Sequence, residues 1–408
     1  MRIFKKNNKK ITIAAVPYSP NLGDGIIHEA LVYSLCKYYK ELQINTIDIS
    51  GRLDYLEHKK KFNVSSLFLN YLVTFPKSIR LTIIYIYIYT LYVFKLKKYY
   101  SDIIAKTETL IIGGGQLFSD VDLNFPLKLH LLFRQVKRHK KNVIIYGVGV
   151  SSTVSGRGKN IFSNLLNNSL VKYIFLRDKI SINNLLNFND ISKQTEEVWD
   201  PGILISDKYP EFLDVKKDYI AINITSPVNL KYSGDSYSKI DFDTFYYKVI
   251  LFLINNNEKR VLLFTNGSFE DEEYKVKLYN YLKKEFKDSL MLSDRPLRPV
   301  ELIQIIAKSK FIISHRLHAN IIAYSYKIPS IGIVWDKKVL GFFKKINREE
   351  MALDLNNFNW YDNIIKLFKN INDFKINDTV YRKNIAEARV QIKKLALKIK
   401  ENEESINS

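Results

Sequence analysis

Short apolar runs rich in β-branched residues recur along the chain, and segments that read as helices follow most of them. The first two runs, at 11–16 and 44–49, flank a predicted helix at 26–39. Further runs of the same kind lie at 109–112, 143–146, 173–176, 219–224, 260–265, 311–313 and 330–334. Strands that alternate with helices are typical of parallel sheets, whose buried strands read as continuous apolar runs. The pattern therefore predicts an α/β protein.

Several of these predicted strands end in glycine or in charged residues. Gly113-Gly114-Gly115 follows one strand, Gly147-Val148-Gly149 the next, and Arg177-Asp178 a third. In an open α/β sheet, ligands bind at the carboxyl ends of the strands. Glycine loops can present N–H groups to an anion, and arginine can bind carboxylate or phosphate through two hydrogen bonds. A tight turn and an internal Arg–Asp pair are the alternative interpretations, and both stay open.

The stretch Phe311–Ala323, FIISHRLHANIIA, changes from strand to helix at Ser314-His315-Arg316, and His318 follows directly. A helix start carries free N–H groups and a partial positive charge, so it attracts anions. Ser314 is predicted to be the N-cap. Two imidazoles and a guanidinium at this point favour a functional site. The alternative is structural, with Arg316 paired to a carboxylate and the histidines satisfied as polar residues.

Asn21-Leu22-Gly23-Asp24 also stands where a strand turns into a helix. Glycine allows close approach of the backbone to a ligand, and Asp24 could cap the helix or bind a hydroxyl group. No carboxylate or third ligand accompanies His315 and His318 at a nearby spacing, so no metal site is predicted. Signatures of a serine or cysteine nucleophile are also absent from the sequence.

A length of 408 residues predicts two domains. We place them at 1–210 and 211–350, followed by a helical tail at 351–408 that packs across both. The single cysteine, Cys36, excludes a disulfide framework and indicates a reducing compartment. The first apolar run is too short for a signal peptide, so the expected location is cytoplasmic.

The net charge of +21 attracts anions, which include nucleic acids, phosphorylated small molecules and acidic membranes. The lysines are dispersed and no nucleic-acid motif is present, so no nucleic-acid partner is expected. One segment, 64–100, differs from its surroundings: Leu81–Phe94 is uncharged and has lysines and tyrosines beside it. It is shorter than the roughly 20 residues that span a membrane. A buried helix or strand and a membrane-docking segment are both open interpretations.

These motifs, in this order, resemble those of the polysaccharide pyruvyl transferase family. The matching residues lie between 11 and about 345 and include Asn21-Leu22-Gly23-Asp24, Gly113-Gly114-Gly115, Gly147-Val148-Gly149, Arg177-Asp178, Asp200-Pro201, Ser314-His315-Arg316-Leu317-His318-Ala319 and Trp335-Asp336-Lys337-Lys338-Val339. The chain departs from the family pattern at Pro20, Gly202 and Trp335, and none of these changes removes a charged group. The segment 64–100 matches no part of the family pattern.

The resemblance implies a GT-B-like fold, in which two Rossmann-like domains with parallel sheets face a central cleft. It implies an enzyme that moves the enolpyruvyl group of phosphoenolpyruvate onto a sugar, forming a pyruvate ketal and releasing phosphate, without a cofactor. The acceptor would belong to a cell-surface polysaccharide, such as a capsule or exopolysaccharide, or to its lipid-linked precursor. Separately from the resemblance, docking of Leu81–Phe94 on lipid would make the protein peripheral on the cytoplasmic face of an anionic membrane; otherwise the expected location is the cytoplasm.

The resemblance also suggests roles for individual residues. The expected catalytic residues are His318, as general acid, with Arg316 and Arg177. Donor binding is expected from Ser314, His315, Lys338, Gly113, Gly114 and Gly115. Acceptor binding is expected from Asn21, Gly23 and Asp24, on the wall opposite the donor. Two alternatives stay open: a GT-B glycosyltransferase that uses a nucleotide sugar, and a non-catalytic, membrane-associated scaffold for glycan assembly.

Overall fold

The structure of the protein is a computed structural model. It describes residues 9–55, 75–188, 191–227, 241–256, 260–357, 359–369 and 375–407. The first part of the Tyr-rich segment, residues 64–74, lies outside the described residues.

The chain forms two compact units, each assembled from separate pieces of sequence. Unit 1 contains Met1–Tyr18, Ile27–Pro201 and Glu387–Ser408, and unit 2 contains Ser19–Ile26 and Gly202–Ala386. The chain therefore passes from one unit to the other more than once. The domain boundaries that we placed near 210 and 350 stay a prediction.

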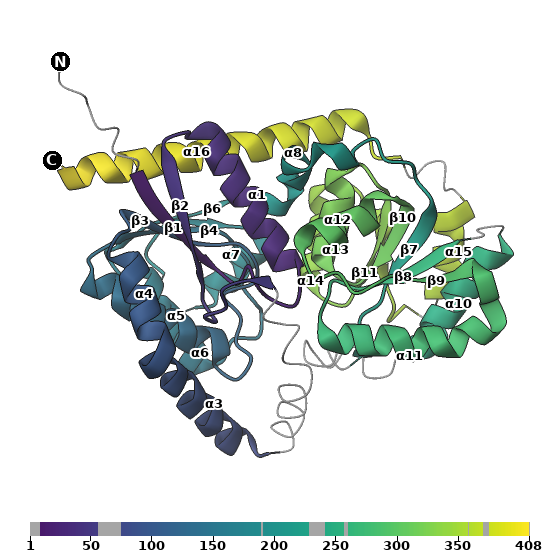
Figure 1. The fold of residues 1–408 in the computed structure, drawn as a ribbon, viewed down its shortest axis with the longest axis horizontal. Helices are drawn as coiled ribbons and strands as arrows, with labels where there is room; N and C mark the ends of the chain where they lie inside the picture. The colour runs from purple at the N-terminus through teal and green to yellow at the C-terminus, as the bar shows by residue number, and fades with distance from the viewer. Residues whose placement is uncertain are drawn as a thin grey trace. The chain divides into compact units, whose positions relative to one another are not determined.

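Unit 1 is built on a six-stranded parallel sheet with the strand order β2-β1-β3-β4-β5-β6 (Figure 1). The strands are β1 (Lys9–Ala15), β2 (Leu42–Asp48), β3 (Thr109–Gly113), β4 (Asn142–Val148), β5 (Val171–Leu176) and β6 (Thr195–Glu197). In β3 and β4 every residue is buried, as expected for strands covered on both faces. Helices of this unit are α1 (Gly23–Tyr38) from Ile27 onward, α3 (Lys77–Leu91), α4 (Lys97–Ile104), α5 (Asn124–Arg138), α6 (Gly156–Leu166) and α7 (Lys179–Leu186).

Unit 2 is built on a second six-stranded parallel sheet, with the order β12-β11-β10-β7-β8-β9. The strands are β7 (Tyr219–Asn223), β8 (Val261–Phe264), β9 (Leu290–Leu292), β10 (Ser309–Ser314), β11 (Ser330–Val334) and β12 (Ala352–Asp354). Its helices are α8 (Ile205–Lys208), α10 (Phe242–Asn255), α11 (Phe269–Phe286), α12 (Pro299–Ala307), α13 (Leu317–Ser325), α14 (Lys337–Lys345) and α15 (Trp360–Lys369). The last helix, α16 (Asp378–Asn407), begins in unit 2 and ends in unit 1.

Each sheet has one point at which the strand order reverses. The reversal lies between β1 and β3 in unit 1 and between β7 and β10 in unit 2. Neighbouring loops leave the sheet in opposite directions at such a point, and the crevice between them is where open α/β sheets bind ligands. The predicted α/β class and parallel sheets are confirmed.

A single helical segment, Lys77–Ile104, occupies the described part of the Tyr-rich region. It consists of α3, a π-helical turn, η2 (Tyr92–Leu96), and α4. The strand interpretation of the Ile-Tyr alternation is therefore wrong. The residues that pack inward recur every four positions: Ile88, Tyr92, Leu96, Tyr100 and Ile104. In an α-helix, residues four positions apart are rotated by about 40° beyond one full turn, so a row of residues with this spacing winds around the helix. The π turn has more residues per turn and therefore reduces this rotation.

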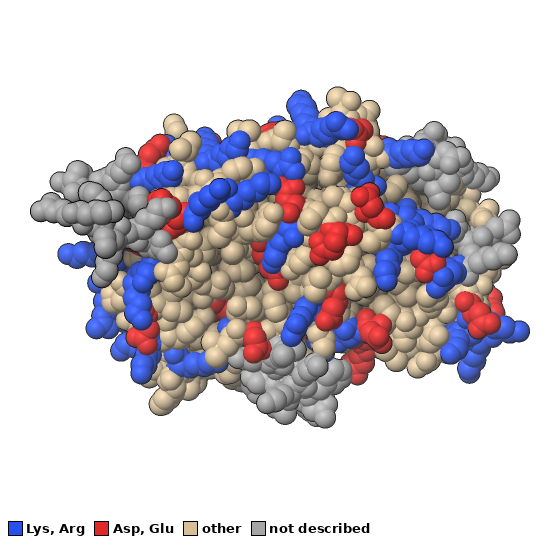
Figure 2. Space-filling model, turned by 45° about the horizontal axis from the view of Figure 1, so that its top comes forward, with Lys and Arg blue, Asp and Glu red and all other residues tan. Residues whose placement is uncertain are grey.

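Within the described residues, Lys77–Ile104 is the one helix long and apolar enough to cross a membrane, although core helices of soluble proteins can share that length and composition. The charged residues, in contrast to these apolar ones, are not gathered in one segment. Lys and Arg are dispersed over the face seen in Figure 2, with Asp and Glu among them.

Candidate functional site

The carboxyl end of β10 meets the start of α13 beside the reversal point of the unit 2 sheet. Strand β10 continues through Ser314, and Arg316 is the N-cap residue of α13. The prediction that Ser314 caps the helix is wrong, because its hydroxyl instead accepts a hydrogen bond from the Arg316 N–H at 3.0 Å. Helix α13 has no side-chain cap. Its first-turn N–H groups and the positive end of its dipole thus point out of the sheet edge.

Arg316 is held in place by Asp271, in the first turn of α11. The Arg316 Nε lies 3.2 Å from Asp271 Oδ2, and Nη2 donates to the same oxygen. Asp271 is fully buried and also accepts the Ser226 N–H at 2.8 Å. The Arg–carboxylate pair considered as the structural alternative is therefore present. It orients one edge of the guanidinium, whose side chain keeps 16% exposure.

His315 lies inside unit 2, within a cluster of aromatic rings. The rings of Phe242, Phe245 and Tyr246 have centroids 5.7 to 5.9 Å from its own. Its Nδ1 is 3.3 Å from the Tyr246 hydroxyl. Burial, assisted by the neighbouring Arg316 charge, lowers the pKa of His315 to about 3. The imidazole is thus neutral near pH 7, and its predicted role in donor binding stays a prediction.

The buried neutral His315 makes folding sensitive to acid. Its pKa is about 3 in the folded protein and near 6.5 in an unfolded chain. As pH falls below about 6.5, the unfolded state takes up a proton that the folded state does not bind. The free energy of unfolding therefore decreases, by up to about 1.4 kcal/mol per pH unit, until the folded pKa is reached.

We expect His315→Gln to remove this contribution. In urea unfolding between pH 7 and pH 4, the wild-type protein should lose more stability than the variant, whatever their difference at pH 7. Parallel pH profiles for the two proteins would contradict the assignment.

His318 lies one residue into α13 and contacts the start of α1. A Cβ added to Gly23 would stand 2.3 Å from His318 Nδ1, so only glycine fits there without movement. The Leu22 N–H donates to the Asn266 carbonyl at 2.9 Å, and Asn266 in turn accepts from Asn223 at 3.0 Å. The placement of Asn21–Asp24 on a wall opposite His318 is therefore wrong: this segment belongs to unit 2 and packs beside that histidine.

Lys338 lies at the start of α14, after the next strand of the same sheet. Asp336 caps this helix by accepting the Lys338 N–H, and its carboxylate lies 3.1 Å from Lys338 Nζ. The ammonium also lies over the Trp335 ring, at 4.6 Å from its centroid. Trp335 Nε1 donates to the His315 carbonyl, which ties the two strand ends together. The sheet edge thus carries both Arg316 and Lys338.

The glycine motifs of unit 1 form two adjoining loops. Gly114 and Gly115 follow β3 with φ of 77° and 72°, in the left-handed region that favours glycine. The loops are joined by hydrogen bonds from Gly114 N–H to the Tyr146 carbonyl and from Gly149 N–H to the Gly115 carbonyl. These two N–H groups form hydrogen bonds between the loops. Anion binding by Gly113–Gly115 stays a prediction.

Arg177 follows β5 and is enclosed by carboxylates within unit 1. Its Nε lies 3.1 Å from Asp178 Oδ2 and its Nη1 lies 3.6 Å from Asp200 Oδ2. Burial tends to raise the pKa of Asp178, but Arg177 and the Ser181 hydrogen bonds outweigh it and lower the pKa. A Cβ on Gly149 would reach 2.6 Å from Arg177 Nη2. The internal ion pair is therefore present, and the catalytic role of Arg177 stays a prediction.

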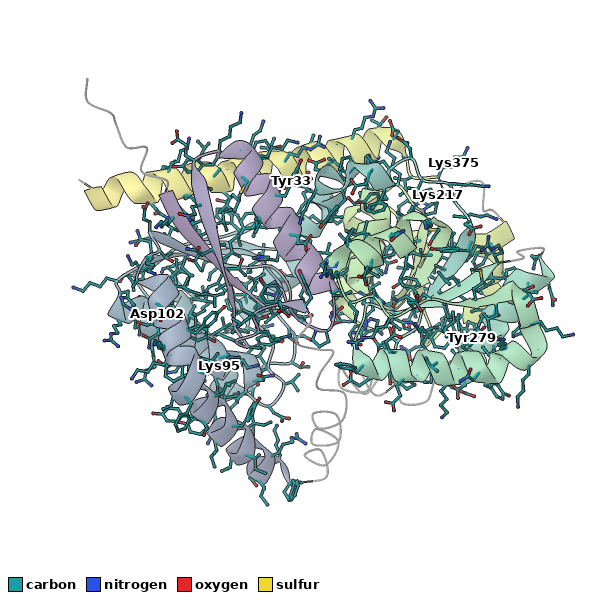
Figure 3. The ribbon with its side chains drawn as sticks, viewed as in Figure 1. Tyr33, Lys95, Asp102, Lys217, Tyr279 and Lys375 are labelled. Carbon is teal, nitrogen blue, oxygen red and sulfur yellow. The ribbon has the colours of Figure 1, made fainter. Side chains whose placement is uncertain are left out.

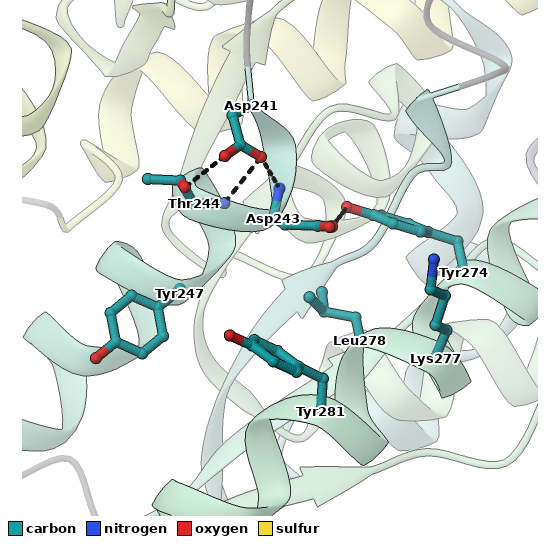
Figure 4. A pocket seen from close by; sticks show the side chains of 8 residues that line it. All are labelled: Asp241, Asp243, Thr244, Tyr247, Tyr274, Lys277, Leu278 and Tyr281. Carbon is teal, nitrogen blue, oxygen red and sulfur yellow. Dashed lines mark hydrogen bonds between the residues drawn. The ribbon is translucent and has the colours of Figure 1, made fainter.

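A hollow of about 360 Å³ lies between α10 and α11 of unit 2 (Figure 4). Tyr247 and Tyr281 line it, and the Tyr274 hydroxyl lies 2.5 Å from Asp243. The Tyr274 ring is 6.2 Å from the Tyr246 ring, which contacts His315. Aromatic contacts therefore connect the hollow to the sheet edge.

The unit 2 edge brings together Ser314, Arg316, His318, Gly23 and Lys338. Gly113–Gly115 and Arg177 lie at the corresponding edge of unit 1. Sequence reasoning missed Asp271, Asn223 and Asn266, although Asn223 lies near the end of the predicted strand 219–224 and Asn266 follows the predicted strand 260–265. No group of three His, Cys, Asp or Glu residues that could hold a metal occurs in the described part of the chain.

The fold defines the chain as a GT-B-like protein. UDP-N-acetylglucosamine 2-epimerase from Rickettsia bellii superimposes with a TM-score of 0.58 at 13% identity, over 98% of both chains. The Methanocaldococcus jannaschii UDP-GlcNAc 2-epimerase, in complex with UDP-GlcNAc and UDP, gives a TM-score of 0.51 at 14% identity over 93% of this chain and 97% of that chain. These neighbours are GT-B proteins, and at this identity they show the fold alone.

The family follows from the sequence itself. The model of the polysaccharide pyruvyl transferase family matches residues 21–337, which is most of the chain. The chain belongs to this family, whose name describes transferases that act on polysaccharides. No curated protein matches the sequence significantly.

Proposed function

We propose that the protein transfers the enolpyruvyl group of phosphoenolpyruvate to two hydroxyls of one sugar in a cell-surface polysaccharide or its lipid-linked precursor. The product is a cyclic pyruvate ketal, and phosphate is released. The observation that supports this most is the unit 2 edge, where Arg316 and His318 stand at the uncapped start of α13. The motif lies within the region that matches the family.

The edge provides what a small, dense anion needs. Helix N-termini, a guanidinium oriented by a buried carboxylate and the Lys338 ammonium all favour negative charge. In this proposal Arg316 and Lys338 hold the phosphate and carboxylate of the donor. They also stabilise the charge that develops on the leaving phosphate. The donor-binding role of Gly113–Gly115 and the catalytic role of Arg177 are proposed for the unit 1 edge.

His318 supplies the proton in the proposed reaction. Protonation of the terminal enol carbon makes the adjacent carbon electrophilic, and the first sugar hydroxyl adds there and loses its proton. The C–O bond to phosphate then breaks, and the second hydroxyl adds and loses its proton. Of the two protons that the sugar hydroxyls lose, one replaces the proton that His318 gave to the methyl group, and the other leaves with phosphate. Imidazole suits this role because it exchanges protons near neutral pH.

The contact between Gly23 and His318 suggests where the acceptor lies. Asn21 and Asp24 flank the glycine that packs on the imidazole. We propose that these polar side chains bind sugar hydroxyls beside the proton donor, on the same edge of unit 2. Because residue 23 has no side chain, its backbone packs directly against the His318 imidazole and limits the orientations that this ring can adopt.

Phosphate release tests the proposal directly. Purified protein is incubated with phosphoenolpyruvate and a lipid-linked oligosaccharide, and inorganic phosphate and acceptor mass are both measured. We expect phosphate release that depends on the acceptor, and a mass gain of the acceptor equal to one ketal-linked pyruvate. Incubation without acceptor is the control for simple hydrolysis.

The outcomes separate this proposal from its alternatives. Transfer of a hexosyl group from a nucleotide sugar, with no phosphate release from phosphoenolpyruvate, would indicate a glycosyltransferase. If cells that carry the His318→Ala variant still form the ketal, the protein is a scaffold and a partner performs the chemistry. Either result would overturn the proposed reaction.

A further inference from the structure

The helical segment Lys77–Ile104 presents an apolar surface to solvent on its outer side. We call this surface the outward face and define it by its exposed residues: Ile79, Tyr85, Ile86, Tyr87, Tyr89, Val93 and Phe94. Phe94 is 85% exposed and Ile86 is 58% exposed. We propose that the outward face docks onto an anionic lipid surface, with the helix lying in the plane of the headgroups. This inference does not depend on the proposed enzymatic function.

The outward face is unusual for a helix on the surface of a globular unit. Such a helix normally carries apolar residues on its packed side and polar residues on the other. Here no charged residue occurs between Arg80 and Lys95, so both sides are apolar. Figure 1 shows α3 along the outside of unit 1, with its N-terminal end farthest from the sheet. Extended exposed apolar patches of this kind mark interaction surfaces.

The packing of the inner side indicates a helix that lies on a membrane and does not cross it. Ile88, Tyr92, Leu96 and Tyr100 are at most 3% exposed and belong to the core of unit 1. The Tyr100 hydroxyl donates to the Ile49 carbonyl at 2.6 Å. A crossing helix would have to abandon these contacts. From Ile79 to Phe94 the outward face is about 22 Å long at 1.5 Å per residue, a length suited to interfacial docking.

The charges around the outward face favour anionic lipid as the partner. Lys77 stands at one end, and Lys95, Lys97 and Lys98 stand at the other, all exposed. Figure 3 labels Lys95, together with Asp102, the sole acidic residue of the segment. Lysine side chains can reach the headgroups while their stems cover apolar surface, and tyrosine is favoured at this depth. Arg80 is instead paired with Asp122 at 2.8 Å.

The same charges disfavour a second copy of this chain as the partner. A symmetric pair of outward faces must bring each end of one helix against an end of the other. Both ends of this segment are positive, so either pairing places lysines beside lysines, which opposes association. A lipid surface provides negative charge along the whole length.

A small hollow beside the outward face extends its apolar surface. It measures about 190 Å³ and lies between α3 and α5, where Tyr89, Leu127 and Leu131 line it. Arg134 is also part of the lining. An apolar groove with one guanidinium suits a lipid tail and its phosphate.

Docking can be followed with a fluorophore at Phe94, the most exposed residue of the outward face. In a Cys36→Ser background, Phe94→Cys is labelled with an environment-sensitive dye. Mixed phosphatidylcholine–phosphatidylglycerol vesicles should shift its emission to the blue, and high salt should reverse the shift in part, because salt screens the lysines. The matched control carries the dye at Leu186→Cys, a residue that is 76% exposed elsewhere in unit 1, and should not respond.

Vesicle flotation of the full chain with native cysteine tests the face itself. The triple variant Ile79→Ser, Ile86→Ser, Phe94→Ser should reduce vesicle binding at least about tenfold. A control triple variant replaces other exposed apolar residues of unit 1: Leu186→Ser, Val390→Ser and Leu397→Ser. It should bind as the wild type does. Each Lys→Gln change at Lys95, Lys97 or Lys98 should reduce binding about fivefold, because one lysine contributes about 1 kcal/mol near such a surface.

Four results would overturn the inference. These are absence of vesicle binding, equal binding to vesicles of phosphatidylcholine alone, no loss of binding in the first triple variant, and a stable dimer in solution that this variant dissociates. The last result would assign the outward face to a second copy of the chain. Circular dichroism of each variant shows whether unit 1 is still folded.

Discussion

His318→Gln is expected to lower the rate of acceptor-dependent phosphate release by about 10²–10⁴ while leaving the fold unchanged. General acid catalysis by a positioned side chain contributes an effect of this size. Glutamine can still donate a hydrogen bond, but it cannot transfer a proton to the enol carbon. Its side chain is close in size to imidazole, so the contact with Gly23 should persist.

His139→Gln is the matched control, because His139 is the C-cap residue of α5 in unit 1 and belongs to neither sheet edge described above. It should retain wild-type activity. Rates and melting temperatures are measured for both variants. Full activity in His318→Gln would remove this residue from the chemistry, and a large fall in melting temperature would instead point to a structural role.

Arg316→Met should destabilise the protein by about 3–5 kcal/mol and abolish activity. The change leaves the Asp271 carboxylate, which is fully buried, without its cation. Removing one partner of a buried ion pair costs this much, because the remaining charge is desolvated without compensation. Urea unfolding and the phosphate assay measure the two effects separately.

The double variant Arg316→Met, Asp271→Leu distinguishes the structural contribution from the functional one. Replacing both partners with apolar residues of similar volume removes the unpaired charge, so most of the stability should return. Activity should not return, because the guanidinium that holds the donor is still missing. A double variant that recovers activity would show that Arg316 serves only to neutralise Asp271.

The surface pair Arg260–Asp218 provides the control for this experiment. Its side chains are 49% and 36% exposed, so water already solvates both charges. Arg260→Met should therefore cost no more than about 1 kcal/mol and leave the reaction unaffected.

The central strands were predictable because their burial on both faces forces continuous apolar runs. Strands β3, β4, β7 and β11 all begin or end within a few residues of the predicted runs. The edge strands β9 and β12 were not predicted, since three residues carry too little periodicity to be recognised. The His-Arg-Leu-His box was found because it combines a strand end with a helix start.

The partners of that box could not be predicted from local sequence. Asp271 precedes Arg316 by 45 residues and looks like an ordinary acidic residue in the first turn of a helix. Gly23 meets His318 only because the start of α1 packs on unit 2, which no local pattern encodes. Ser314 was misassigned as a cap because its hydroxyl forms a local turn with Arg316. The outer side of α3 also required the structure, since the segment is apolar all round.

Helix α16 has a consequence for how the protein is made. Its residues from Glu387 onward complete unit 1, where Ile392, Leu395 and Ile399 are buried, and the Trp199 N–H donates to Gln391 at 2.7 Å. A ribosome that has synthesised residues 1–201 has therefore not yet supplied all of unit 1. The early segment Ser19–Ile26, conversely, must wait for the second sheet before it can pack. Unit 1 therefore cannot reach its final packing during synthesis until the residues from Glu387 onward have emerged, whereas unit 2 is supplied in full once Ala386 has been added.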